Sequence, residues 1–147
     1  MPDVIRLDSI PRLHPGALPI VPLTMSSFDR RRVRRRLEAP DGTVFELALP
    51  TGSVLQVAQA IHLSHEAAYV VVAADEDVLV IRPRSLAEAA HVGHLVGNLH
   101  RDLDIDDDGT LTALWDEPLE RRLRAAGLDA WRARRPFRGR APGEHAH

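Results

Sequence analysis

The sequence contains no cysteine and no lysine. Without cysteine, the chain cannot form disulfides, thiolate zinc sites, iron–sulfur clusters or a cysteine nucleophile. Because all 19 basic residues are arginines, it also has no lysine for a Schiff base or a phosphate-binding P-loop. A transition-metal site in this chain must therefore rely on histidine, of which there are eight.

The sequence also lacks a large excess of positive or negative charge, and it has no long apolar run. The formal net charge is −2 over 147 residues, whereas a dedicated nucleic-acid binder usually has a basic excess. The longest apolar run, 67–74, is too short to cross a bilayer, and charged residues interrupt the N-terminal stretch where a secretory signal would be apolar. We therefore expect a cytoplasmic protein that binds neither nucleic acid nor membranes.

Catalytic motifs are also missing. The sequence has no G-x-S-x-G, no glycine-rich phosphate loop and no H-E-x-x-H. The largest group of carboxylates is the acidic stretch 104–108, where solvation is the simplest explanation. We predict that the chain is not an enzyme.

The first half of the chain has the pattern of short strands. Four prolines within 8–24 exclude a helix there. Over 33–39, the set Val33, Arg35, Leu37 and Ala39 alternates with charged residues, and apolar residues alternate again over 45–49. Pro-Asp-Gly turn residues lie between the two stretches, so we predict a β-hairpin. Residues 54–60 could form a strand or a helix, and 68–73 has the composition of a buried strand.

The second half alternates strands with helices. Ser85 and Glu88 form a capping box, in which the serine accepts from the Glu88 amide and the glutamate reaches back to the Ser85 amide. We expect this helix to end at Gly97-Asn98, which tolerate left-handed backbone. The other predicted elements are strands at 78–81, 103–105, 111–114 and 130–134, and a helix at 116–126 that ends at Gly127.

The resulting order β-α-β-β-α-β is the ferredoxin-like arrangement. We predict an α+β protein with a β-rich N-terminal domain at 1–74 and a ferredoxin-like domain at 75–135. The boundary falls at the polar stretch 75–77, which interrupts two strand runs. Residues 136–147, rich in proline, glycine and charge, are expected to form a flexible tail.

Histidines provide the candidate metal ligands. His91 and His94 share a helix face, a spacing that permits chelation but is more often found in surface histidines. His62 and His65 repeat that spacing without supporting context. His100 differs because it follows the turn-forming Gly97-Asn98, where ligand residues are often positioned. A single histidine cannot hold a metal, so His100 would need partners from the tail or from a second chain.

Two charged stretches have alternative interpretations. Residues 104–109 match the D-x-D-x-D-G opening of a calcium loop, but Trp115 occupies the position of the bidentate glutamate, so we favour an acidic hairpin. The arginine-rich stretch 30–36 has no interleaved aromatic residue for stacking on single-stranded nucleic acid. We favour a solvated strand face, with a protein-docking surface as the alternative.

Several of these segments together resemble the family of the urease accessory nickel chaperone, UreE. The likeness covers most of residues 28–135. It rests on Arg30–Leu37, the Asp41-Gly42 turn, Leu47–Leu55, Val78–Pro83, the alanine-rich helix, Gly97-Asn98-Leu99-His100, and Asp116–Gly127.

The resemblance implies a peptide-binding-like N-terminal domain and a metal-binding ferredoxin-like domain. It further implies a homodimer in which His100 meets its symmetry mate and binds nickel, with His145 and His147 of the tail completing the coordination. Zinc and copper would compete for the same nitrogens. The implied activity is delivery of Ni(II) to the urease apoprotein together with other urease accessory proteins, including the GTPase.

The sequence also departs from the family pattern. The third motif position is commonly arginine and is Leu99 here, and Trp115-Asp116-Glu117 stands where some members have further histidines. The tail has only two histidines, so we predict no multi-nickel storage. His91 and His94 match no family ligand and remain an auxiliary candidate. The alternative function is a metal-independent peptide-binding or scaffold module that uses the N-terminal domain.

Overall fold

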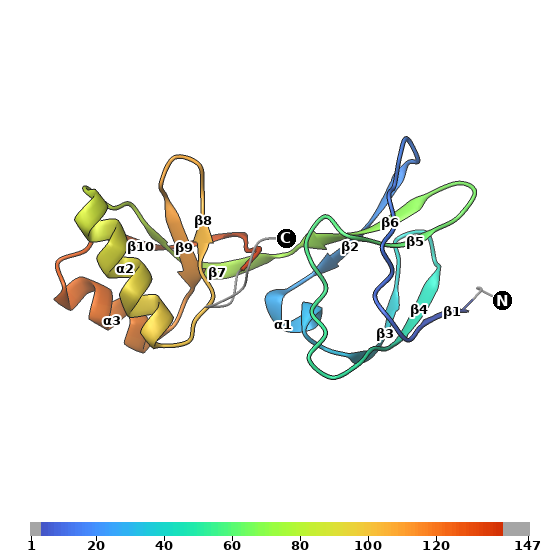
Figure 1. Cartoon of the computed structure of the whole chain (residues 1–147), viewed down its shortest axis with the longest axis horizontal. Coiled ribbons are helices and arrows are strands. Elements are labelled where there is room, and N and C mark those ends of the chain that lie inside the picture. The colour runs from blue at the N-terminus through green and yellow to red at the C-terminus, as the bar shows by residue number, and fades with distance from the viewer. Residues whose placement is uncertain (1–3, 140–147) are drawn as a thin grey trace. The chain divides into compact units, whose positions relative to one another are not determined.

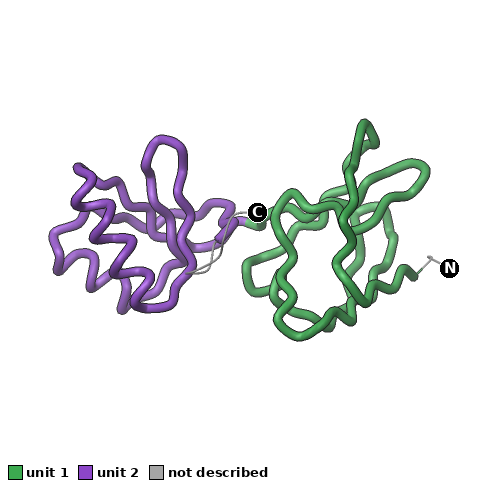
Figure 2. The backbone as a smooth tube through the Cα atoms, in the orientation of Figure 1, with its two compact units in different colours: residues 1–74 green, residues 75–147 purple. Residues whose placement is uncertain are grey.

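The computed structural model describes residues 4–139, and the chain divides into two compact units, 1–74 and 75–147 (Figure 2). Strands outnumber helices in the described part, so the predicted α+β class is confirmed. In chain order the elements are β1 (Val4–Leu7), β2 (Ile20–Met25), α1 (Ser27–Arg30), β3 (Arg34–Glu38), β4 (Val44–Ala48), β5 (Ala60–Leu63), β6 (Ala68–Ala73), β7 (Asp75–Ile81), α2 (Leu86–Asn98), β8 (Asp104–Ile105), β9 (Leu111–Leu114), α3 (Glu117–Ala125) and β10 (Ala130–Pro136). None of the described helices is both long and apolar enough to cross a membrane.

Unit 1 consists of two three-stranded sheets, ordered β1-β4-β3 and β2-β6-β5 (Figure 1). The predicted hairpin is confirmed, since β3 and β4 pair antiparallel with Leu37 opposite Phe45. Both sheets contribute to one core, which includes Leu23, Met25, Leu37, Phe45, Leu47, Ile61, Tyr69 and Val71. No helix forms within 8–24, as the prolines predict.

The segment 54–60 is neither the strand nor the helix that its composition favours. Only Ala60 belongs to a strand, and Ala58 has a positive φ of 71°. A turn closes from the Gln59 amide to the Gln56 carbonyl, and the Gln56 amide donates to the Gln59 side chain. The two glutamines satisfy their polar groups locally, and this competes with regular structure.

A polar latch joins the β3–β4 turn to β6 within unit 1. The Tyr69 hydroxyl donates to the Asp41 carboxylate at 2.6 Å and lies 3.0 Å from the Thr43 hydroxyl. The hydrogen bond from Tyr69 lowers the pKa of Asp41 from 3.8, and the same bond raises the pKa of Tyr69 from 10.0. The latch therefore holds the turn of one sheet against a strand of the other.

Replacing Asp41 with asparagine is expected to lower the pKa of Tyr69 toward its ordinary value and to cost unit 1 about 1 kcal/mol. Because the pKa of Asp41 is lowered in the folded state, its contribution to stability is full above about pH 4 and is lost as the pH falls further. Tyr69 is the only tyrosine, so its ionisation can be followed by ultraviolet absorbance. If Tyr69 ionised at the same pH in the variant as in the wild type, the hydrogen bond between Tyr69 and Asp41 would be contradicted.

Unit 2 has one antiparallel sheet, ordered β10-β7-β9-β8, with α2 and α3 on one face (Figure 1). On the helical face a core forms from Leu79, Ile81, Val92, Val96, Leu111, Ala113, Leu119, Leu123 and Leu128. The opposite face has its own cluster, made of Val78, Val80 and Phe137 with Leu114, Trp131 and Ala133 packed against them. Alternation along the strands thus buries both faces of the sheet.

Two boundaries in unit 2 differ from the sequence predictions. The polar stretch 75–77 does not interrupt the strand, because β7 begins at Asp75 and pairs with the end of β10. The sequence predicts a flexible tail from residue 136 onward, but Pro136 ends β10 and Phe137 is fully buried. One apolar ring within a polar, proline-containing segment is enough to fix the chain on the sheet.

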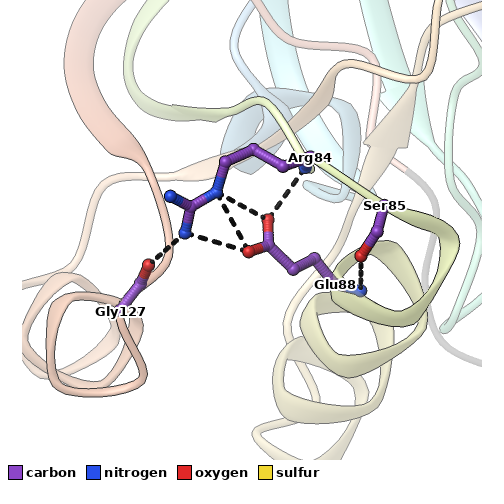
Figure 3. A network of polar contacts seen from close by, with 4 residues as sticks. All are labelled: Arg84, Ser85, Glu88 and Gly127. Carbon is purple, nitrogen blue, oxygen red and sulfur yellow. Dashed lines mark hydrogen bonds and ion pairs between the residues drawn. The ribbon is translucent and has the colours of Figure 1, made fainter.

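The start of α2 is capped as the sequence indicates, with one difference (Figure 3). The Ser85 hydroxyl accepts from the Glu88 amide at 3.1 Å. The Glu88 carboxylate reaches back to the amide of Arg84, at 2.8 Å, and not to that of Ser85. Arg84 also donates to the Gly127 carbonyl at 2.9 Å, so the network joins the start of α2 to the end of α3. The Arg84 amide lowers the pKa of Glu88.

Replacing Ser85 with alanine is expected to lower the free energy of unfolding of unit 2 by about 1 kcal/mol, because one helix amide loses its acceptor. Both tryptophans lie in unit 2, so their fluorescence in a urea titration reports on this unit. Ser26→Ala removes the equivalent cap of α1 in unit 1 and should leave the tryptophan signal unchanged. Equal midpoints for Ser85→Ala and the wild type would exclude the cap's contribution.

Candidate metal-binding site

His100 occupies the left-handed position that ends α2. The helix runs to Asn98 with Leu99 as its C-cap, and His100 has a φ of 54°. The His100 amide donates to the Gly97 carbonyl at 3.0 Å, and the Arg101 amide donates to the Val96 carbonyl at 3.2 Å. These two bonds are those of a Schellman motif, with His100 at C′.

The second helix of the same unit ends with the same bonds and a different residue. Gly127 has a φ of 74°, its amide donates to Arg124, and the Leu128 amide donates to Leu123. Glycine is the usual residue at this position because it has no Cβ. The prediction that Gly97-Asn98 provide the left-handed residue of α2 is wrong: both belong to the helix, and His100 takes the role that Gly127 has in α3.

A left-handed histidine costs roughly 1–2 kcal/mol relative to the right-handed helix region. Such strain is typical of positions where the side chain has a task. The His100 side chain is exposed, whereas Leu99 before it packs against the core of unit 2. Arg101 after it is paired with Asp116, the N-cap residue of α3, at 3.2 Å. The neighbours thus anchor the loop and leave the imidazole accessible.

His100 has no complete ligand set around it within residues 4–139. Across that range, no three histidine or carboxylate side chains are grouped closely enough to hold a metal ion. His145 and His147, the other predicted ligands, lie outside the described residues. One imidazole alone holds a transition metal weakly, so further ligands would be required for a site at His100.

The remaining histidines are in other surroundings. His91 and His94 are exposed on α2, and the His94 Nε2 lies 3.2 Å from the side-chain Nδ2 of Asn98, a hydrogen bond between side chains of the same helix. His62 is half-buried and packs against Phe45 and Tyr69, with ring centroids 5.9 and 5.7 Å away. His62 is therefore an edge residue of the unit 1 core.

The acidic stretch forms the predicted hairpin. β8 and β9 pair with Ile105 opposite Leu111, and the turn closes where the Gly109 amide donates to the Asp106 carbonyl. The Thr110 amide donates to Asp108 and lowers its pKa. A hollow of about 240 Å³ beside the hairpin is lined by Asp104, Ile105, Asp106, Asp107 and Arg138, so an arginine already supplies positive charge there.

The arginine-rich stretch is not uniformly solvated. Arg30 is 3% exposed at the end of α1 and donates to the Met25 carbonyl at 2.9 Å. Arg35 is half-buried, 3.5 Å from Asp29, whereas Arg36 is exposed and pairs with Glu46. The period-2 pattern predicts the inward side of β3 correctly, but Arg30 precedes the strand and has a structural role.

Comparison with known proteins identifies the family of this chain. No family model matches the chain. It is 51% identical over 133 residues to the urease accessory protein UreE of Synechococcus sp. (strain JA-3-3Ab), covering 90% of this chain and 89% of that protein. It is 50% identical over 127 residues to the urease accessory protein UreE of Deinococcus radiodurans, covering 86% of this chain and 81% of that protein.

A more distant relative has the same name. The UreE of Haemophilus influenzae (strain Rd) is 29% identical over 115 residues, covering 78% of this chain and 61% of that protein. The names confirm the prediction of an accessory protein that is not itself an enzyme. At about half identity over nearly the whole length of both proteins, the chain belongs to the urease accessory protein UreE family.

Proposed function

We propose that the protein is a cytoplasmic nickel metallochaperone that delivers Ni(II) to apo-urease through His100. In this proposal His100 of two copies meets at a homodimer axis, which doubles every ligand, and His145 and His147 complete the coordination. Unit 2 would be the ferredoxin-like metal-binding domain. Its β-α-β-β-α-β order and its strand order β10-β7-β9-β8 support this assignment.

The observation that carries the proposal is the histidine at the C′ position of α2. The same unit has glycine at the equivalent position of α3, so a helix of this unit can end in this motif without backbone strain. An exposed imidazole is retained there at an energetic cost, in a chain whose relatives assist urease. Imidazole suits nickel, and zinc and copper would compete for the same nitrogens.

Titration of nickel into the full-length protein tests the proposal. We expect about one His100-dependent site per dimer, and loss of that site in His100→Ala. His65→Ala, which removes an exposed histidine of unit 1, should bind as the wild type does. Unchanged affinity in His100→Ala would overturn the assignment of His100. Sedimentation with and without nickel measures the dimer.

A second function, metal-independent capture of a peptide, is supported by a groove in unit 1. The groove, of about 590 Å³, lies between β2 and β3, which are both edge strands, and edge strands can pair with an added chain. It is lined by Pro22, Leu23, Thr24, Met25, Arg35, Leu37, Glu38, Ala39 and Pro40. Capture of urease or accessory proteins that survives both a chelator and His100→Ala would favour this function.

A further inference from the structure

The inner face of β3 places an arginine between two apolar residues. Val33 and Leu37 both pack in the core of unit 1, and Arg35 lies between them on the same face because side chains of a strand alternate. The Arg35 side chain is 15% exposed. It lines the groove of about 590 Å³ between β2 and β3, and among the described residues around that groove it is the only base. The groove therefore offers one positive charge beside apolar side chains.

Two nitrogens of Arg35 have no hydrogen-bond partner. Nε and Nη1 are both inaccessible to water, and neither has an acceptor in the described part of the chain. Asp29 lies 3.5 Å from Nη1 as an ion pair, and it also lies 3.7 Å from Arg32. Buried donors are normally satisfied, because leaving a charged one without an acceptor costs free energy. The guanidinium is therefore suited to an acceptor that residues 4–139 do not supply.

The backbone of β3 has an open edge. The Leu49 amide donates to the Val33 carbonyl just before β3, and the Ala39 amide donates to the Thr43 carbonyl just after it. The odd-numbered residues of this stretch therefore bond toward β4, and the N–H and C=O groups of residues 34, 36 and 38 point to the other side. β3 ends its sheet, so no described strand pairs with that side. An extended segment can add there as a further strand.

The strand on the other side of the groove is a poorer template. The Ala68 amide of β6 donates to the Pro19 carbonyl just before β2. The Ala74 amide donates to the Met25 carbonyl at the end of β2. Residues 20, 22 and 24 therefore face the open side of β2, and Pro22 has no N–H to donate there. An added strand would pair with β3, and β2 would form the opposite wall.

The charge of β3 indicates which occupant fits. The strand has three consecutive arginines and one glutamate, Glu38, which is exposed and alternates to the outer face. Two copies of this edge would set arginine against arginine, and like charges directly opposite are destabilising. A second copy of this chain therefore does not suit the groove. A segment with a carboxylate opposite Arg35, and apolar residues on both sides of it on the same face, matches both the charge and the apolar neighbours.

We propose that β3 binds an extended acidic segment of a partner protein by strand addition, and that Arg35 selects a carboxylate side chain in that segment. This inference rests on the second proposed function, peptide capture by unit 1, and adds the chemistry of the captured segment. In the complex the Arg35 side chain turns from Asp29 into the groove and donates to the carboxylate. Its planar fork of N–H donors suits such a bidentate pair.

Fluorescence anisotropy with a labelled, end-capped peptide, acetyl-TVTETVT-amide, tests the proposal on the full-length protein. In an extended chain the valines and the glutamate of this peptide share one face, and the threonines lie on the other. We expect it to bind about tenfold more tightly than acetyl-TVTQTVT-amide, because the glutamine amide cannot form a charged pair with Arg35. A short oligothymidylate measures the attraction of any polyanion and should bind more weakly than the glutamate peptide.

Variants of β3 separate Arg35 from the general charge of the strand. Arg35→Gln should abolish the preference for glutamate over glutamine, whereas Arg34→Gln, which removes an exposed arginine of the same strand, should keep it. Arg36→Pro removes an N–H from the open edge and should weaken both peptides. Its matched control is Arg36→Gln, since both variants lose the ion pair with Glu46 and only one loses the N–H. The raised pKa of Tyr69 shows that unit 1 is folded in each variant.

The outcomes distinguish the role of Arg35 from peptide capture itself. Equal affinity of the wild type for the two peptides, or an unchanged preference in Arg35→Gln, would overturn the role of Arg35 and leave peptide capture standing. If neither peptide binds, or if the oligothymidylate binds as tightly as the glutamate peptide, strand addition of an acidic segment is wrong. Capture of urease or accessory proteins in the presence of a chelator, measured separately, still decides the second proposed function.

Discussion

Replacing His100 with glycine is expected to abolish the His100-dependent nickel site and to leave unit 2 at least as stable as the wild type. Most substitutions that remove a ligand also disturb the fold, but here the ligand occupies a position that favours glycine. His100 has a φ of 54° and completes the Schellman motif of α2. The wild type is therefore no more stable than a chain with glycine at this position, because the imidazole requires a residue with a Cβ in the left-handed region.

The size of the effect follows from two opposing contributions. Removing the Cβ relieves about 1–2 kcal/mol of left-handed strain, and glycine's extra freedom in the unfolded chain costs about 0.4–1 kcal/mol. The net expected gain is about 0.5–1 kcal/mol for His100→Gly. Alanine keeps the strain, so His100→Ala should be less stable than His100→Gly although neither binds nickel at this site.

The reciprocal substitution is the matched control. Gly127 ends α3 with the same pair of hydrogen bonds, and nothing lies within 4 Å of an added Cβ there. Gly127→His should therefore cost about 1–2 kcal/mol from backbone strain alone and should create no nickel site. Urea unfolding followed by tryptophan fluorescence, paired with calorimetric nickel titration, measures both quantities. If His100→Gly had a lower free energy of unfolding than His100→Ala, the proposed backbone strain at this position would be contradicted.

The sequence predicts that His100 lies at the end of a helix, but it misplaces the left-handed residue of that end. The order of motifs selects His100 correctly as a residue at a helix end, but glycine propensity placed the left-handed position at Gly97-Asn98. Both residues are helical in the structure. The helix continues because Val96 and Leu99 still bury apolar surface, and burial outweighs the weak preference of one glycine. Propensity alone therefore locates a helix end only to within a few residues.

Strands were predictable where alternation is strong and not where pairing is distant. The 33–49 hairpin follows from local pattern and turn residues, and it is present as expected. By contrast, β1 forms through parallel pairing with β4, forty residues away, and no local signal indicates such a partner. Asp104 has the same difficulty: its composition favours solvation, and only the folded chain brings two amides of residues 138–139 to its carboxylate.

Replacing Phe137 with alanine is expected to destabilise unit 2 by about 3 kcal/mol, although composition alone places this residue in a flexible tail. Phe137 is fully buried against Val78 and Val80. Truncating a buried phenylalanine to alanine costs about 3–5 kcal/mol, since transfer energy and packing are both lost. A domain of this size has roughly 3–10 kcal/mol in total, so the variant should unfold at distinctly lower urea concentration.

Two shortened chains separate the ring from the residues beyond it. A chain that ends at Gly139 keeps Phe137 and the Asp104 contacts, and its unfolding midpoint should match the wild type. A chain that ends at Pro136 loses both and should be destabilised by about 3 kcal/mol or more. Phe28→Ala makes the same chemical change at a side chain that is 73% exposed on α1 and should leave the tryptophan transition in place. If Phe137→Ala behaves like Phe28→Ala, the sheet face opposite the helices does not depend on this ring.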